Sequence, residues 1–234
     1  MPGKKIMLPD WATWLLFSSM IIVAIAGVGT WFWSRWKVKK IQAQQSNEEE
    51  KQRKLEILQK RGDDLGTLPY DLKDFFGSRV QDWDLESWIN TIFLNDYKNV
   101  LIVNKNTEYE LAVLMLKTKA NIFEIQNNIN INLWNKAVLN FPQYFNRKCK
   151  IKTEAELRCI SVNLVLANNS LIESFDLFNT YFNMLDKNGM LIIRLDNKKD
   201  KSFKSLLKNL KQSLIPFELT TVNSKFIYIV KKNN

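Results

Sequence analysis

The chain has 234 residues, of which 46% are hydrophobic and 25% charged, a composition that can form a folded core and excludes global disorder. Histidine is absent, which excludes Ser-His and Cys-His nucleophile pairs, histidine metal ligands and a histidine general base. The net charge of +10 suits an anionic membrane face, an acidic partner or nucleic acid, and a lysine-rich solvated surface accounts for it more simply.

The N-terminal part consists of a tail at 1–10 and a long uncharged segment at 11–34. As a helix this segment would reach roughly 36 Å at about 1.5 Å per residue, enough to cross a bilayer. Tryptophans stand near both of its ends, as in the aromatic belts of membrane–water interfaces: Trp11, Trp14, Trp31, Trp33 and Trp36. We therefore predict a transmembrane helix over 11–36 that contacts the lipid bilayer.

The charges that flank this segment predict its orientation. Fewer basic residues precede it than follow it; they are Lys4 and Lys5 before, and Arg35, Lys37, Lys39 and Lys40 after. The more basic side of a membrane helix stays in the cytosol or matrix. We expect a single-pass membrane protein with its large C-terminal domain on that side, and the basic, AT-biased composition suggests the mitochondrial inner membrane.

Residues 37–77 are predicted to form a charged helical stalk and a linker. Glu49 with Arg53, and Glu50 with Lys54, are spaced four apart in the order that stabilises a helix. Few apolar residues occur in the first part of this segment, so the helix is expected to be solvated or to lie along a partner. Glycines at the end of the helix and in the linker mark its termination: Gly62 and Gly66.

Residues 78–234 are predicted to form one α/β domain. Apolar strands alternate with amphipathic helices, which indicates a mostly parallel sheet covered on both faces, and the last two strands form an antiparallel hairpin. The predicted helices are Asp84–Leu94, Glu110–Lys119, Leu133–Phe141, Leu171–Lys187 and Ser202–Ile215. The predicted strands are Asn99–Val103, Asn121–Gln126, Lys148–Lys152, Ser161–Ala167, Gly189–Leu195, Phe217–Val222 and Lys225–Val230.

This order of elements resembles the class I S-adenosylmethionine-dependent methyltransferase fold over roughly Asp84 to Lys232. The best piece is VNLVLANNSLIESFDLFNTYFNMLDKNGMLIIRL, Val162–Leu195, which looks like that family's fourth strand, long helix, Leu-x-x-x-Gly turn and fifth strand. The resemblance implies a Rossmann-like, methyltransferase-type mixed sheet preceded by the transmembrane helix. A match of pattern specifies fold better than activity.

The turn after the first predicted strand departs from the family. In the family this turn is Gly-rich, because only glycine lets backbone amides approach the cofactor closely. Here 104–110 contains no glycine, and Glu108 and Glu110 would place negative charge near the cofactor carboxylate. After Gly77 the domain has a single glycine, Gly189, which belongs to the turn before the fifth strand. We therefore interpret the domain as a degenerate methyltransferase-like domain that has lost catalysis.

One cofactor-binding residue can still be carried over from the resemblance. The family holds the ribose hydroxyls with an acid at the end of its second strand, and Glu124 stands there in IFEIQ; the alternative is a surface acid at a strand end. The family's Pro-Pro-aromatic turn is replaced by 167–170, and its usual fourth-strand acid by Asn163. No catalytic or metal-binding residue is predicted, because Cys149 and Cys159 form no CxxC pair.

These observations predict a membrane-anchored structural or accessory subunit of a larger membrane complex, of a mitochondrial respiratory type by analogy. It would not be an enzyme, would bind no cofactor, and would have other membrane-protein subunits as partners. One alternative is a divergent membrane-anchored methyltransferase in which Glu124 holds the ribose. Another is a membrane-tethered nucleic-acid or anionic-lipid binding module. That alternative rests on a basic run near the C-terminal end: Lys198, Lys199, Lys201, Lys204, Lys208 and Lys211. A solvated helix explains this run equally well, so nucleic acid is not an expected partner.

Overall fold

The computed structural model describes residues 48–147, 149–157, 159–197, 200–221 and 224–232, together with residues 11, 14, 35 and 37. By its internal contacts the chain divides into two compact units, Met1–Leu55 and Glu56–Asn234. The predicted tail at 1–10 and almost all of the predicted span at 11–36 lie outside the described residues. Within the described ranges, no helix combines the length and apolar character needed to cross a bilayer. This finding contradicts the predicted single-pass membrane location.

Residues 48–61 are helical, which confirms the predicted helix for this part of the chain. Glu50 and Lys54 form the predicted ion pair at 2.6 Å, although both side chains are exposed and such pairs stabilise a helix by only a few tenths of a kcal/mol. The 3-10 turn η1 (Gly62–Asp64) follows the helix. Gly62 and Gly66 have φ angles of +53° and +76°, a left-handed conformation that favours glycine.

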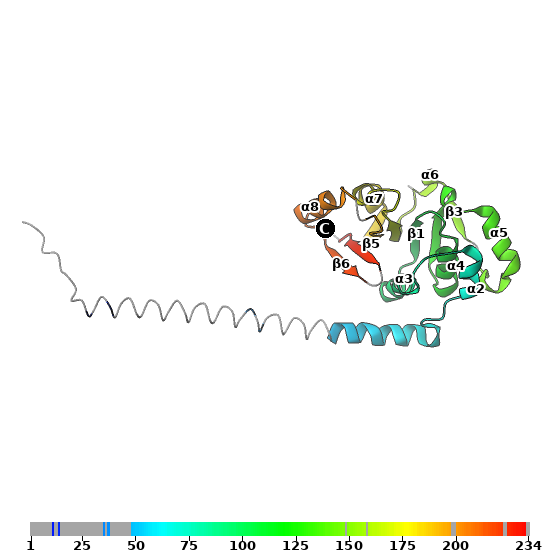
Figure 1. Cartoon of the computed structure of the whole chain (residues 1–234), viewed down its shortest axis with the longest axis horizontal. Helices are drawn as coiled ribbons and strands as arrows, with labels where there is room; N and C mark the ends of the chain where they lie inside the picture. Colours follow the sequence, from blue (N-terminus) through cyan, green and yellow to red (C-terminus); the bar gives the residue numbers. More distant parts are fainter. Residues whose placement is uncertain are drawn as a thin grey trace, which may run out of the picture. The chain divides into compact units, whose positions relative to one another are not determined.

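Within the described residues, the second unit contains a seven-stranded sheet with the order β3-β2-β1-β4-β5-β7-β6. Figure 1 shows part of this sheet, with β1, β3, β5 and β6 labelled. The strands from β1 to β5 are parallel to one another, whereas β7 is antiparallel to both β5 and β6. This arrangement confirms the predicted mostly parallel sheet with a C-terminal antiparallel hairpin. The strands are β1 (Asn99–Val103), β2 (Asn121–Ile125), β3 (Lys150–Lys152), β4 (Val162–Asn168), β5 (Leu185–Arg194), β6 (Phe217–Thr221) and β7 (Lys225–Val230).

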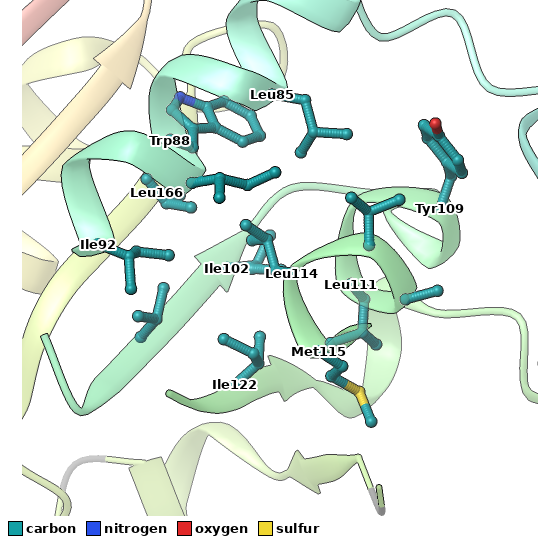
Figure 2. Close-up of a cluster of buried hydrophobic side chains, with 14 of the residues drawn as sticks. Leu85, Trp88, Ile92, Ile102, Tyr109, Leu111, Leu114, Met115, Ile122 and Leu166 are labelled. Atoms are coloured by element: carbon teal, nitrogen blue, oxygen red, sulfur yellow. The ribbon is translucent and has the colours of Figure 1, made fainter. Parts of the chain in front are cut away.

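Helices cover both faces of this sheet and enclose two hydrophobic clusters. One cluster joins the strands to the helices α2 to α5, and Figure 2 shows part of it: Leu85, Trp88 and Ile92 pack against Leu111, Leu114, Met115 and the strand residues Ile102, Ile122 and Leu166. The other cluster lies under α7 and α8. The helices are α2 (Tyr70–Phe76), α3 (Asp82–Asn95), α4 (Glu108–Lys117), α5 (Ile131–Asn140), α6 (Glu154–Leu157), α7 (Ser174–Tyr181) and α8 (Phe203–Gln212), with short 3-10 turns at η2 (Gln126–Asn128), η3 (Pro142–Tyr144) and η4 (Phe182–Met184).

One predicted helix, Leu171–Lys187, is much longer than the helix in the structure. α7 begins at Ser174 and ends at Tyr181, and Leu171 before it is 67% exposed. The apolar residues at the C-terminal end keep a helical spacing, but Leu185 already belongs to β5 and pairs with Val162 of β4. Sheet pairing here overrides the local pattern.

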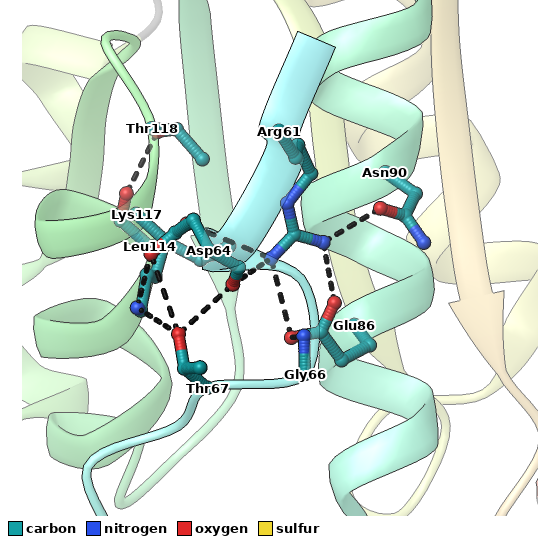
Figure 3. Close-up of polar contacts among 9 residues, drawn as sticks. All are labelled: Arg61, Asp64, Gly66, Thr67, Glu86, Asn90, Leu114, Lys117 and Thr118. Atoms are coloured by element: carbon teal, nitrogen blue, oxygen red, sulfur yellow. Dashed lines mark hydrogen bonds and ion pairs between the residues drawn. The ribbon is translucent and has the colours of Figure 1, made fainter. Parts of the chain in front are cut away.

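A buried arginine attaches the end of the helical residues 56–61 to α3 (Figure 3). Arg61 is only 6% exposed, and its guanidinium donates to both carboxylate oxygens of Glu86 and, at 2.7 Å, to Oδ1 of Asn90. The backbone N–H of Gly66 also donates to Glu86, at 3.2 Å. Lys117 of α4 completes the network through an ion pair with Asp64 at 2.5 Å. The residues just before the sheet are therefore part of its compact unit.

Candidate functional site

The candidate site lies where the carboxyl ends of β1, β2 and β4 meet, since parallel strands end at the same edge of a sheet. The turn after β1 runs from Asn104 to Thr107, and Asn106 has a φ angle of +56°. Asparagine tolerates this left-handed conformation better than most residues, so the turn forms without glycine. The backbone N–H of Asn106 donates to the carbonyl of Asn128 at 3.0 Å, which joins this turn to the segment after β2.

Glu124 in β2 is fully buried beside this turn, so the alternative of a surface acid is wrong. Its carboxylate accepts a hydrogen bond from Thr107 Oγ1 at 2.6 Å and another from the backbone N–H of Ile125 at 2.9 Å. Burial raises the pKa of Glu124 to about 8, although these hydrogen bonds act to lower it. The structure thus brings the one predicted cofactor-binding residue next to the glycine-free turn after β1.

The first turn of α4 places two further acids in this region. Glu108 and Glu110 are 4% and 7% exposed. Glu108 accepts a hydrogen bond of 2.6 Å from the backbone N–H of Asn130 and so holds the segment before α5. Glu110 has no hydrogen-bond partner on its Oε2 atom, and burial raises its pKa to about 7.

Asn104, at the end of β1, is a second buried side chain with an unpaired acceptor. It is 7% exposed, and its Oδ1 atom makes no hydrogen bond. A buried acceptor without a partner destabilises a fold by about 1–3 kcal/mol, and a ligand that supplied donors to these two atoms would remove that cost. From the sequence alone, the side chains of 104–110 are expected only to obstruct a cofactor. Acids in the first turn of a helix are usually exposed, so no sequence signal indicated their burial.

The end of β4 is held by a network of polar side chains around Asp200. Asn169 donates to Asp200 at 3.0 Å, and Ser174 donates to it through both its backbone N–H, at 2.9 Å, and its hydroxyl, at 2.5 Å. Burial acts to raise the pKa of Asp200, but the hydrogen bonds from Ser174, Ser202 and Asn169 outweigh it and hold this pKa well below its usual value. The network fixes the segment after β4 to the segment after β5.

Asn163 does not belong to the candidate site. It lies near the start of β4, and its Oδ1 atom accepts hydrogen bonds of 3.0 Å from the backbone N–H groups of Lys98 and Asn99. These residues precede and begin β1, so Asn163 lies at the amino ends of the strands, opposite the cofactor edge. Its role is to join two neighbouring strands.

The basic run falls on α8 and the residues before it. Leu206 and Leu210 of α8 are buried, whereas Lys204, Lys208 and Lys211 are exposed. Lys198 and Lys199 lie outside the described residues. In the parts of the chain that the structure describes, no three potential metal ligands of the His, Cys, Asp or Glu type lie together.

No protein-family model matches this chain, and no curated protein is significantly similar to it in sequence. Solved structures, in contrast, share its fold. A methyltransferase from Geobacter sulfurreducens has 10% sequence identity and a TM-score of 0.53, over 72% of this chain and 93% of that one. An O-methyltransferase from Bacillus cereus, solved with SAH, has 9% identity and a TM-score of 0.54, over 71% and 92%. A SAM-dependent O-methyltransferase from Thermotoga maritima has 10% identity and a TM-score of 0.50, over 71% and 72%.

These matches confirm the predicted class I methyltransferase-like fold. They also contradict the prediction that the chain is not an enzyme, since the solved structures that share the fold are methyltransferases. The absence of glycine alone does not decide whether the chain is an enzyme, because the side chains in its place leave buried acceptors without a partner.

Proposed function

We propose that this chain is a divergent S-adenosylmethionine-dependent methyltransferase whose cofactor lies at the carboxyl ends of β1 and β2. The observation that carries this proposal is the pair of unpaired buried acceptors, Asn104 Oδ1 and Glu110 Oε2, close to the turn that Glu124 supports. The likeness to methyltransferases supports it at the level of fold.

The chemistry of these side chains fits the cofactor. S-adenosylmethionine offers hydrogen-bond donors in its ribose hydroxyls and its ammonium group, and its ammonium and sulfonium groups are both cationic. A site that presents carboxyl and amide oxygens satisfies such donors, and a carboxylate is also attracted to the positive charge. The cofactor has one negative group against two positive ones, so Glu108 and Glu110 do not exclude it.

Each residue then has a distinct part in binding. Glu124 would accept from the ribose hydroxyls, and Thr107 keeps its carboxyl group in place through their hydrogen bond. Glu110 and Asn104 would accept from the ammonium group. When bound, the cofactor supplies a methyl group made electrophilic by the sulfonium. The buried surroundings of Glu110 and Glu124 exclude water from these contacts and so strengthen them.

Isothermal titration calorimetry of the full chain with S-adenosylmethionine tests this proposal. We expect saturable binding, at least a tenfold loss of affinity in Glu110→Gln, and a similar loss in Glu124→Gln. Glu154→Gln is the matched control, because Glu154 is an exposed acid on α6. If neither heat nor a shift in thermal unfolding appears at millimolar cofactor, or if the control loses as much affinity as the site variants, the proposal is wrong.

A further inference from the structure

The two edge strands of the sheet differ in how strongly their side chains discourage pairing with another chain. β3, at one edge, is a short strand that begins and ends with lysine, and charged side chains on an edge strand discourage pairing with another chain. β6, at the other edge, reads FELTT and contains no lysine. Among the described residues, no further strand pairs with β6 on its outer side.

The hydrogen bonds between β6 and β7 show which backbone groups of β6 face outward. Val230 donates its N–H to the carbonyl of Pro216 at 3.0 Å, so these residues form a hydrogen-bonded pair of the antiparallel ladder. Such pairs alternate with non-bonded ones, which places Glu218 and Thr220 of β6 in the remaining bonded pairs. The outward N–H and C=O groups therefore belong to the other residues of the strand: Phe217, Leu219 and Thr221.

We propose that β6 pairs with β6 of a second copy of this chain, antiparallel and centred on Leu219. In this register Leu219 pairs with the partner's Leu219, and Phe217 pairs with the partner's Thr221. Every outward N–H group of the strand then meets a carbonyl of the other copy. The pairing is isologous, as a closed two-fold dimer requires, and it extends the sheet across both copies.

The side chains of β6 are self-complementary in the same register. Leu219 is 50% exposed and, with Leu195 and Phe203 among others, lines a small cavity of about 90 Å³ at this edge. The partner's Leu219 would cover this apolar surface. On the other face of the strand, Glu218 lies opposite the partner's Thr220, so no like charges are brought together. This register pairs every outward hydrogen-bonding group of β6 and opposes no like charges, which favours a second copy of the chain as the partner.

Sedimentation velocity of the purified full chain tests this dimer. A mild nonionic detergent is present throughout, because the uncharged segment 11–34 could otherwise associate by itself. We expect a dimer that dissociates on dilution, and a monomer for Leu219→Lys, which places two ammonium groups at the two-fold axis. Leu139→Lys is the matched control, because Leu139 is 80% exposed and lies on α5 and not on β6. A wild-type monomer at high micromolar concentration, or a Leu219→Lys chain that dimerises like the wild type, would overturn the proposal.

A disulfide experiment tests the register itself. Opposite Cα atoms in a hydrogen-bonded antiparallel pair lie about 5.5 Å apart, within the range that a disulfide spans. In a chain carrying Cys159→Ser, Leu219→Cys should form a covalent dimer with oxidised glutathione, and Leu139→Cys should not. Equal yields from the two cysteine variants would contradict the register. Circular dichroism and thermal unfolding confirm that each variant is folded before it is compared.

Discussion

Thr107 donates a hydrogen bond of 2.6 Å to Glu124, and this bond joins the turn between β1 and α4 to the end of β2. Both side chains are almost completely buried. The two segments that would hold a cofactor are therefore fixed to each other before any ligand arrives, and such preorganisation reduces the entropy lost on binding. The unpaired acceptors of Asn104 and Glu110 lie at the same carboxyl ends of the strands, which is why we place the cofactor there.

Cofactor binding should release a proton near neutral pH. Burial raises the pKa of Glu110 to about 7, so a substantial fraction of this carboxyl is protonated in the free protein at pH 7. An ammonium group beside it favours the ionised form and lowers this pKa. Calorimetric titration in buffers of different ionisation enthalpy measures the number of protons released. We expect release near pH 7 in the wild type and much less in Glu110→Gln; equal release in both would show that Glu110 does not meet the cation.

Glu124 should make the chain less stable as the pH rises. Its pKa is raised from 4.5 to about 8, so between these values the folded state holds a proton that the unfolded state has released. The unfolded state binds fewer protons in this window, and the free energy of unfolding falls as pH increases through it. Urea unfolding at pH 5 and pH 8 should show a smaller fall for Glu124→Gln than for the wild type. The free energy of unfolding of Glu154→Gln should fall as much as that of the wild type. An equal fall in Glu124→Gln would show that Glu124 is not the group responsible.

Asp200, in contrast to Glu124, should make the chain more stable as the pH rises, and it should do so at lower pH. Its pKa is held below the usual 3.8, so its contribution to stability is complete above that value and is lost as the pH falls below it. Asp200→Asn should lower the free energy of unfolding at pH 7 by about 1 kcal/mol, since charge-assisted hydrogen bonds become neutral ones. The difference from the wild type should shrink near pH 3. Acid-unfolding curves of the two proteins measure it, and a difference that is independent of pH would contradict this account.

Among the charged residues near the start of the second unit, we expect Arg61 to contribute most to stability. Its guanidinium is buried against Glu86, and removal of one partner from a buried ion pair typically destabilises a protein by about 3–5 kcal/mol. We expect Arg61→Ala to lower the free energy of unfolding by that amount. Lys60→Ala removes an exposed ion pair with Glu56 and an exposed hydrogen bond of 3.3 Å to the carbonyl of Phe93, and it should change the free energy of unfolding by less than about 1 kcal/mol. Chemical denaturation compares the two, and equal effects would contradict the structural role of Arg61.

The arrangement of the sheet was predictable, because strands and helices of this domain keep clear apolar periodicities. β1 begins and ends at the predicted residues, Asn99 and Val103. Where two patterns overlap, tertiary contacts decide the outcome: Leu185 has helical spacing but pairs in the sheet. The local sequence does not show which distant residues pair in the sheet.

The candidate site was only partly predictable. The resemblance identified Glu124 and the turn after β1, and the structure brings them together. The burial of Glu110 and Asn104 depends on how α4 packs against the strands, which neither charge nor spacing reveals. Arg61 illustrates the same limit, since a charged helix that reads as solvated ends in a buried guanidinium.

The central claim is that the carboxyl ends of β1 and β2 bind S-adenosylmethionine. Structure determination of the full chain soaked with this cofactor tests it most directly. We predict ribose hydroxyls within hydrogen-bond distance of Glu124 and the ammonium group on Glu110. Density for the nucleoside at another position, or none at saturating cofactor, would contradict the account.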